Sequence, residues 1–306
     1  MFFNKKTKPL LLVVNPKAGK CTAKHKLYDL VSYFSRFGYE VTVYPTKRNE
    51  TSLYVQNNAH RYERIVCCGG DGTLSEVLAG VYKSGLKTPV GYIPMGSTND
   101  YANNMSIQKK LPLAALTAAR GYVMDYDLGL FNGTPFSYVA AVGAFTAASY
   151  STPQKLKNSI GHLAYIIEGA KSITNIKPIP ITVEVNGKTV KDNFIYISVG
   201  NTLSMGGVLK LNKKDVDFCD GKFEVLLLKH PKNAFVAIEM ITDLLAGRFK
   251  TKNIALLHTN RVKFTFEKPT IFSLDGEKSE PCTEAVVTNK HAATRVIVPT
   301  IANNKQ

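Results

Sequence analysis

The stretch VCCGGDGTLSEVLAG at residues 66–80 carries the clearest chemical signal in the chain. A glycine-rich turn follows an apolar run there, and glycine lets the backbone approach a ligand closely and adopt positive φ. The N–H groups at the start of the helix that follows would attract an anion such as phosphate. Asp71 would repel phosphate unless Mg²⁺ bridged the two. The alternative is a tight strand-to-helix turn in which Asp71 serves only as the N-cap.

A second turn, within GYIPMGSTNDYANN at 91–104, is rich in groups that donate hydrogen bonds. Ser97, Thr98 and Asn99 offer hydroxyl and amide donors to phosphate oxygens. Asp100 is a second candidate partner for a metal ion or for its water ligands. The alternative is a capping cluster for a helix that begins near Tyr101.

A third turn, within VVNPKAGK at 13–20, offers Asn15, Lys17, Gly19 and Lys20 directly after an apolar run. It is not a Walker A loop, because the pattern GxxxxGK[ST] is absent. The alternative is an ordinary basic loop.

The elements around these turns predict a parallel sheet. Continuous apolar runs and helical spacing alternate along the first third of the chain. The predicted strands cover 10–14, 40–44, 64–68 and 90–93, and the predicted helices cover 24–37, 51–61 and 74–82. Such alternation favours a sheet with both faces covered, and ligands of such sheets bind beyond the carboxyl ends of the strands. Because all three turns follow strands, we expect them to meet at that edge and to bind phosphate together.

The alternation of strands and helices ends near residue 130, after which the predicted elements are mainly antiparallel strands. The predicted strands cover 136–141, 179–185, 194–199, 223–228, 260–266 and 285–288, and the predicted helices cover 156–173 and 233–245. The dipeptide Asn186-Gly187 is the strongest hairpin signal in the chain. These elements indicate a second, mostly β domain.

The three turns together resemble a known family. NPKAGK, GGDGTLSEVLAG and GSTNDYANN, in this order and spacing, are similar to the catalytic domain of the diacylglycerol kinase and sphingosine kinase superfamily. GGDGT is also shared with NAD kinases and is related to the phosphofructokinase nucleotide site. The GSTND segment narrows the resemblance to lipid kinases.

The resemblance implies a fold and a division of the chain. An α/β nucleotide-binding domain like that of NAD kinase and phosphofructokinase, with a parallel sheet, would cover residues 1–130. A mainly antiparallel β-sandwich domain for the lipid substrate would cover 131–291, and a C-terminal segment, 292–306, would return to the first domain. The active site would lie between the two domains and would use ATP and Mg²⁺.

The resemblance also assigns roles to residues by their position in the motifs. Asp71, Asp100 and Asp127 would organise the catalytic Mg²⁺, partly through water, with Asp125 as a competitor for the last role. The residues implied to bind the nucleotide are Asn15, Pro16, Lys17, Ala18, Gly19, Thr46, Gly69, Gly70, Gly72, Thr73, Leu74, Ser75, Glu76, Ser97, Thr98 and Asn99. Ser75 and Ser97 stand where the family usually has Asn and Thr, and both keep the capacity for hydrogen bonding.

FSLDGEKSE at 272–280 resembles the family segment that supplies the catalytic base, which would be Glu277. A carboxylate there could accept the proton of a lipid hydroxyl as the γ-phosphoryl group arrives. The alternative is a surface β-turn, because Asp-Gly is a common turn dipeptide.

DVDFCDGKFEVLLL at 215–228 resembles a family loop that holds a structural Mg²⁺. Asp220 and the backbone carbonyls of Asp217 and Lys222 match its ligands. Cys219 stands where the family often has an acidic residue, so this loop has one carboxylate fewer.

Charge and composition limit the partners. The chain has 39 Lys and Arg against 23 Asp and Glu, a formal charge of +16, which favours polyanions such as an anionic bilayer, nucleic acid or polyphosphate. The basic residues are scattered without an aromatic–basic platform, which disfavours nucleic acid. No stretch approaches 18 apolar residues, so membrane contact would be peripheral. Five cysteines without a CxxC motif predict buried thiols in a reducing compartment.

The resulting hypothesis is an ATP-dependent lipid kinase, cytoplasmic and peripheral at the inner face of the cell membrane. Diacylglycerol, converted to phosphatidic acid, is the leading substrate. A polyprenol, phosphatidylglycerol, a sphingoid base or a ceramide would also present a hydroxyl group. A soluble NAD kinase-type enzyme and a non-catalytic nucleotide sensor are the remaining alternatives, and family likeness favours a homodimer. Phe145, Ile160, Leu163 and Ile166 are candidates for contact with acyl chains or for the core.

Overall fold

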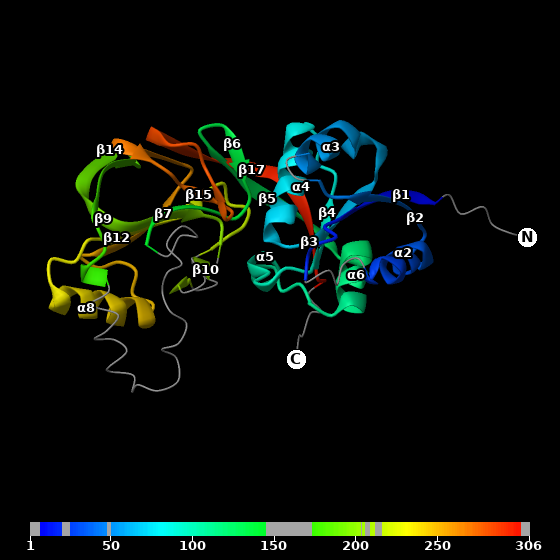
Figure 1. Ribbon diagram of the computed structural model, residues 1–306, viewed down its shortest axis with the longest axis horizontal. Coiled ribbons are helices and arrows are strands. Elements are labelled where there is room, and N and C mark those ends of the chain that lie inside the picture. The colour runs from blue at the N-terminus through cyan, green and yellow to red at the C-terminus, as the bar shows by residue number, and fades with distance from the viewer. Residues whose placement is uncertain are drawn as a thin grey trace, which may run out of the picture. The chain divides into compact units, whose positions relative to one another are not determined.

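The computed structural model describes residues 7–19, 25–47, 50–144, 173–202, 204–205, 209–211 and 216–300. The chain divides into two compact units (Figure 1). The first comprises Met1–Leu128 and His291–Gln306, and the second comprises Gly129–Lys290. The predicted helix over 156–173 lies outside the described residues except at residue 173, and the candidate acyl-chain contacts Phe145, Ile160, Leu163 and Ile166 lie outside them as well.

The first unit is built on a parallel sheet, as predicted. Its neighbouring strands are, in order, β2 (Tyr39–Pro45), β1 (Lys8–Val14), β3 (Arg64–Gly69) and β4 (Val90–Pro94). The C-terminal part of β17 (Cys282–Val298) pairs in parallel with β4 through Val296 and Val90, and β5 (Tyr122–Phe131) pairs with β17. The apolar runs of β1, β3 and β4 are buried, as expected for strands covered on both faces.

Helices cover both faces of this sheet (Figure 1). Helix α2 (Leu27–Arg36) and helix α6 (Leu111–Arg120) pack against one face, in a core with Leu10, Leu12 and Val66. Helices α3 (Thr51–Asn58) and α4 (Asp71–Lys83) lie together on the other, and a 3₁₀ turn, η1 (Ala59–Arg61), continues α3. Helix α6 was not predicted, because its buried stripe consists of alanines, whose weak apolar signal hides the helical period.

The second unit is an antiparallel β-sandwich, which confirms the predicted fold class. Its strands include β6 (Thr134–Phe136), β7 (Val139–Gly143), β8 (Ile179–Val185), β9 (Lys188–Gly200), β12 (Phe223–Lys229), β13 (Ile254–Thr259) and β14 (Arg261–Thr270). Strand β9 pairs with β7, β8 and β12, and β14 pairs with β8 and with the first part of β17. Short strands β10 (Ser204–Met205) and β11 (Leu209–Lys210) pair with each other.

Alternate residues of β12 belong to two different apolar clusters. Phe223, Val225 and Leu227 contribute to the interior of the sandwich. Leu226 and Leu228 contribute to a cluster with Met240 of helix α8 (Ala234–Leu245), so α8 covers the outer face of this sheet. The side chain of Asn233 caps α8 by accepting a hydrogen bond of 3.0 Å from the backbone N–H of Val236.

The Asn186-Gly187 hairpin is confirmed. The two residues have φ of 51° and 73° and join β8 to β9, with Val185 paired to Lys188. Two-residue hairpins of this kind need positive φ at both central positions, which Asn and Gly adopt most easily.

The strand predicted over 136–141 is wrong as a single element. It is divided into β6 and β7 by Ser137 and Tyr138. The backbone N–H groups of these two residues donate to the side chain of Asp275 instead of to a neighbouring strand. A distant carboxylate therefore interrupts a sequence pattern that is locally typical of a strand.

Among the described residues, no helix is long and apolar enough to cross a membrane. The thiols of Cys67 and Cys68 are buried and free, as predicted, and burial raises the pKa of Cys68 to about 12.

Helix α4 lies so close to α3 that only glycine fits at position 80. A Cβ there would stand 2.6 Å from the carbonyl oxygen of Ser52 and 2.7 Å from Cβ of Val55. We expect Gly80→Val to lower the free energy of unfolding by about 1–3 kcal/mol through overpacking. Lys83→Val, at an exposed position of the same helix, is the matched control and should change it by less than about 0.5 kcal/mol. Urea unfolding measures both, and equal midpoints for the two variants would contradict this packing argument.

Candidate functional site

The turn between β3 and α4 presents the start of a helix without a capping side chain. Helix α4 begins at Asp71, its N-cap is Gly70 in an extended conformation, and no side chain caps it. The first N–H groups of a helix have no partner within the helix. They are therefore well placed to bind an anion beyond the carboxyl end of β3.

Asp71 does not cap its own helix. Its carboxylate accepts hydrogen bonds from the backbone N–H groups of Asp100 at 3.0 Å and Tyr101 at 3.2 Å, and from the hydroxyl of Tyr92 at 3.4 Å. Asp100 and Tyr101 open helix α5 (Asp100–Asn104). Asp71 thus caps the next helix and ties the GGDGT turn to the GSTND turn.

Asp71 and Asp100 form an acidic pair at this junction. Partial burial, followed by the negative charge of Asp71, raises the pKa of the Asp100 carboxyl above its usual value. A carboxylate whose pKa is raised by a neighbouring carboxylate is stabilised by a cation. The donor set of carboxylate oxygens beside helical N–H groups therefore fits Mg²⁺ bound together with phosphate.

The two glycine-rich turns touch through their backbones. A Cβ on Gly96 would lie 2.8 Å from Cα of Gly70 and 2.9 Å from Oδ1 of Asn99. Asn99 is buried and has φ of 53°. Its amide accepts from the N–H of Gly96 and donates to the carbonyl of Gly96, both at 2.7 Å. Asn99 therefore shapes the turn, and its predicted contact with nucleotide stays a prediction.

The third predicted turn lies at the same edge of the sheet. Nδ2 of Asn15 donates to Oγ1 of Thr73 at 3.1 Å, and Oδ1 of Asn15 accepts from the N–H of Lys17 at 3.0 Å. The N–H of Thr46 donates to the carbonyl of Val14 at 2.8 Å. The turns after β1, β2, β3 and β4 are thus brought together.

The predicted nucleotide contacts differ in exposure. Lys17, Gly19, Gly72, Ser97 and Thr98 are exposed. The half-buried ones are Asn15, Pro16, Thr46, Gly70, Ser75 and Glu76. The buried ones are Ala18, Gly69, Thr73 and Leu74. The side chain of Leu74 belongs to the core, so only its backbone groups can face a ligand.

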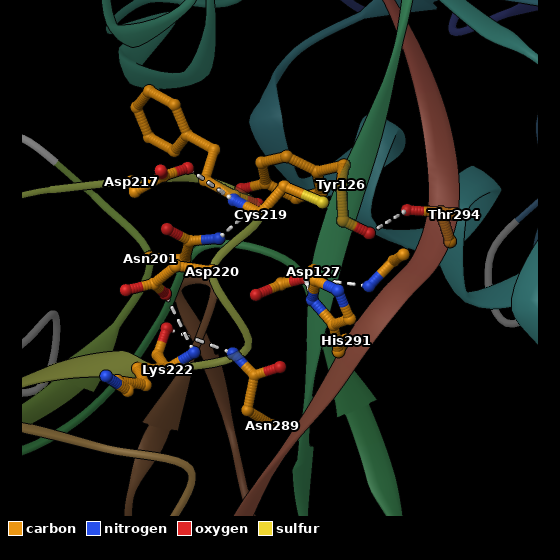
Figure 2. Close-up of polar contacts among 12 residues, drawn as sticks. Tyr126, Asp127, Asn201, Asp217, Cys219, Asp220, Lys222, Asn289, His291 and Thr294 are labelled. Carbon is orange, nitrogen blue, oxygen red and sulfur yellow. Dashed lines mark hydrogen bonds and ion pairs between the residues drawn. The ribbon is translucent and has the colours of Figure 1, made fainter.

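Asp127 lies on β5 and is fully buried. Its Oδ1 accepts from the N–H of Ala292 at 2.7 Å and lies 3.1 Å from Nδ1 of His291 (Figure 2). The ring of Tyr126, its neighbour in the strand, contacts the ring of Tyr101 at 5.6 Å. Because successive strand residues point to opposite faces, the carboxylate of Asp127 points away from that ring contact. The competing residue, Asp125, is exposed and forms an ion pair with Arg295 at 3.1 Å.

In the second unit, Glu277 lies on a hairpin that is fixed to the sheet. Strands β15 (Ser273–Leu274) and β16 (Glu277–Lys278) pair with each other, and β15 pairs with β7. The carboxylate of Asp275 accepts from the N–H groups of Ser137, Tyr138 and Val139 at 2.7–2.9 Å. The exposed carboxylate of Glu277 therefore projects from a turn that backbone hydrogen bonds hold in place.

The loop predicted to hold a structural metal is organised by its own acidic side chains (Figure 2). Asp217 accepts from the N–H of Cys219 at 3.0 Å, and Asp220 accepts from the N–H of Lys222 at 2.8 Å. Asn289 donates to the carbonyl of Lys222, and Asn201 donates to the carbonyl of Phe218, both at 3.0 Å. These contacts set the direction of the carbonyl of Lys222, one of the predicted ligands.

Comparison with known proteins shows the family to which this chain belongs. A model of the diacylglycerol kinase catalytic domain matches residues 9–131, and one of the YegS C-terminal NAD kinase beta sandwich-like domain matches residues 139–298. A diacylglycerol kinase of Bacillus subtilis is 31% identical over 270 residues, which cover 87% of this chain and 88% of the relative. The chain belongs to the diacylglycerol kinase family. It is therefore a kinase, a transferase of phosphoryl groups, as the resemblance of its motifs indicated.

Further similar proteins support the same family assignment. A diacylglycerol kinase of Staphylococcus aureus is 30% identical over 259 residues, covering 84% of this chain and 79% of the relative. The crystal structure of a diacylglycerol kinase from Bacillus anthracis matches with a TM-score of 0.73 at 19% identity, covering 96% of this chain and 97% of that one. Another Bacillus anthracis structure matches with a TM-score of 0.78 at 21% identity, covering 96% and 98%. At these identities the structures support the fold.

Sequence reasoning did not find two buried residues beside the loop that was predicted to hold a metal in this kinase. Asn201 follows Gly200 of β9, and Gly200 pairs with Glu224 of β12. Both side chains are 1% exposed, and Oδ1 of Asn201 and Oε2 of Glu224 make no hydrogen bond within the described structure. The other oxygen of Glu224 lies 4.0 Å from Nε2 of His258. Buried acceptors without donors suit a cation, so the residues present fit a bound Mg²⁺ here.

No pattern of neighbouring residues in the sequence indicates the other contacts that were not predicted. Tyr92, His291 and Asp275 act through partners that are distant in sequence. Glu224 stands in an apolar run, FEVLLL, where one charged residue resembles an ordinary exposed strand position.

The environment of Glu224 predicts how stability depends on pH. Burial, followed by the charges of Asp220 and Asp217, raises the pKa of Glu224 from 4.5 to about 8. Between these values the unfolded chain loses the proton and the folded chain keeps it, so the free energy of unfolding falls as pH rises. In metal-free buffer we expect Glu224→Gln to exceed the unchanged protein in stability by up to a few kcal/mol at pH ~8.5, and to match it near pH ~4.5.

Urea unfolding in EDTA at the two pH values measures this difference. Glu184→Gln, at an exposed position of β8, is the control and should leave the pH dependence unchanged. An advantage of Glu224→Gln that is equal at both pH values would contradict the assigned cause.

Proposed function

We propose that this kinase transfers the γ-phosphoryl group of ATP to a lipid hydroxyl, with diacylglycerol as substrate and phosphatidic acid as product. The observation that carries the proposal is the junction of the GGDGT and GSTND turns through Asp71. It places an acidic pair beside the start of α4, in a chain related to named diacylglycerol kinases. Kinase membership implies the use of ATP.

In this proposal the first unit binds the nucleotide. The N–H groups at the start of α4 hold phosphate oxygens, and the exposed hydroxyls of Ser97 and Thr98 add donors. Thr46 lies near the base or ribose. Asn15 orients the hydroxyl of Thr73 through their hydrogen bond.

Asp71 and Asp100 would hold Mg²⁺, and Asp127 would contribute negative charge from β5. When bound, the ion neutralises the phosphate charge that grows during transfer. The carboxylate of Asp71 keeps its hydrogen bonds to α5, so the position of the acidic pair relative to the N–H groups at the start of α4 is fixed.

Glu277 would act as the general base. One of its carboxylate oxygens accepts the proton of the lipid hydroxyl. The hydroxyl oxygen forms the new bond to the γ-phosphorus as the bond from that phosphorus to ADP breaks. The exposed position of Glu277 leaves room for a substrate, and the hydrogen bonds of Asp275 limit how far its turn can move. Asp275 is therefore a positioning residue in this proposal.

Transfer of label from ATP tests the substrate directly. We expect labelled phosphate in the lipid when the full chain meets mixed micelles that contain diacylglycerol. Parallel reactions contain NAD, or phosphatidylglycerol, a polyprenol or a sphingoid base in the same micelles, or no acceptor. Label in NAD would favour a soluble kinase of the NAD kinase type, and label in another lipid would replace diacylglycerol. Absence of transfer to every acceptor would favour a nucleotide sensor.

A matched pair of variants tests the base. Glu277→Gln should lower kcat by roughly 10²–10⁴-fold, because the amide cannot accept the proton. Glu280→Gln changes an exposed glutamate three positions along the chain and should retain near-normal turnover. The thermal midpoint of both variants shows whether they fold. Near-normal turnover of Glu277→Gln would remove Glu277 from this role.

We also propose peripheral contact with an anionic membrane at its cytoplasmic face, because the chain carries a formal charge of +16. Binding to phosphatidylglycerol vesicles should be strong at low salt and should fall at least tenfold near 0.5 M NaCl, since salt screens surface charges. Sedimentation with the vesicles measures it, with neutral vesicles as the control. Vesicle binding that does not change with salt concentration would contradict the electrostatic cause. The homodimer stays a prediction that the same preparations can test by light scattering.

A further inference from the structure

The second unit contains a cavity of about 380 Å³ at the end of the sandwich formed by the β8–β9 hairpin. Apolar side chains from four strands line it, including Val185, Val190, Phe194, Leu227 and Leu257. This volume lies within the range of about 300–1,000 Å³ that is typical of small-molecule sites. The cavity therefore has the size and the lining of a binding pocket.

The cavity exists because one wall of the sandwich is left uncovered. Val190 of β9 pairs with Val183 of β8, which is fully buried. Val190 itself is 41% exposed although it lines the same cavity. Apolar walls that face a gap lose the contacts that close packing would provide. An alkyl chain in the cavity would restore these contacts and cover Val190.

The charged residues that line the cavity are all basic. Lys188, Lys229 and Lys252 contribute to it, and no acidic residue does. Lys229 forms an ion pair with Asp192 at 2.7 Å. Lys188 and Lys252 are exposed and take part in no ion pair among the described residues. Lysine stems can lie along apolar surface while the charged ends meet an anionic group at the opening.

This cavity is separate from the hairpin that carries Glu277. The hairpin joins β7 at Ala140 and Ala141, which pair with Val199 and Ser198 near the end of β9. The cavity is lined by Lys188, Val190 and Phe194 of the first part of β9. The residues that line the cavity are therefore different from those that hold the Glu277 hairpin.

We propose that this cavity is an accessory site for a single alkyl chain that ends in an anionic group. The chain lies between the two sheets against Val190, Phe194 and Leu257, and the anionic group meets Lys188 and Lys252. The proposal goes beyond the kinase reaction and does not depend on it, because binding needs neither ATP nor Glu277.

Calorimetric titration of the full chain, without ATP, tests the site. The probe is dodecyl phosphate, kept below the concentration at which it forms micelles. We expect saturable binding of one molecule per chain. Dodecanol lacks the charge and inorganic phosphate lacks the chain, so each should bind at least tenfold more weakly. Absence of saturable binding, or equal binding of inorganic phosphate, would overturn the proposal.

Charge variants locate the anionic group. Lys188→Glu combined with Lys252→Glu should weaken binding of dodecyl phosphate by at least tenfold. Lys83→Glu combined with Lys87→Glu changes two exposed lysines of the first unit by the same total charge and should leave binding unchanged. Equal weakening by both pairs would show a general charge effect and would overturn the assignment.

Two further variants locate the alkyl chain. Ala255→Leu fills the cavity and should abolish binding. Val190→Glu, at the exposed wall, should do the same without a change in the buried core, which keeps the test valid if Ala255→Leu fails to fold. Glu277→Gln should bind the probe as the unchanged protein does. Loss of binding in Glu277→Gln would place the probe at the kinase site and contradict a separate cavity.

Discussion

The hydrogen bonds from the first N–H groups of α5 to the carboxylate of Asp71 are the interaction on which the proposed nucleotide site depends. They stabilise a negative charge that is only partly exposed, because the start of a helix attracts anions. Together with the pairing of β3 and β4, they fix the distance between the two turns. The close approach of Gly70 leaves no space for a side chain at Gly96. The same carboxylate therefore sets the backbone geometry and supplies half of the acidic pair.

The second unit uses the same device at the turn before Glu277. Asp275 accepts from successive N–H groups that would otherwise extend a strand, and it thereby divides β6 from β7. The cost to the strand is offset by several charge-assisted hydrogen bonds, which are stronger than neutral ones. In both units a carboxylate bound to the backbone N–H groups of another segment fixes the position of a turn that carries a proposed catalytic residue. The loop proposed to hold a metal uses local hydrogen bonds of the same kind, with Asp217 and Asp220 accepting from residues two positions ahead.

Prediction from the sequence succeeded where the signal was local and strong. The apolar runs of β1, β3 and β4 could be read directly, since a strand covered on both faces has no polar side to break the run. Asn186-Gly187 also gave a reliable signal, because positive φ depends on the residue itself. Helix α6 was missed because its alanines give little contrast between faces, and the division of β6 from β7 was missed because its cause is Asp275.

The sequence by itself determined the family, the fold class of each half of the chain and the residue types that could bind phosphate and metal. These depend on motifs of a few residues and on their spacing. Only the tertiary structure decided that Asp71 caps α5, that Asp127 bonds to Ala292, and that Glu224 is buried without a full set of partners. The tertiary structure also decided that Val190, at the end of the sandwich, stays partly exposed. Each of these features depends on how segments distant in sequence pack together, and the local sequence pattern of a segment does not contain that information.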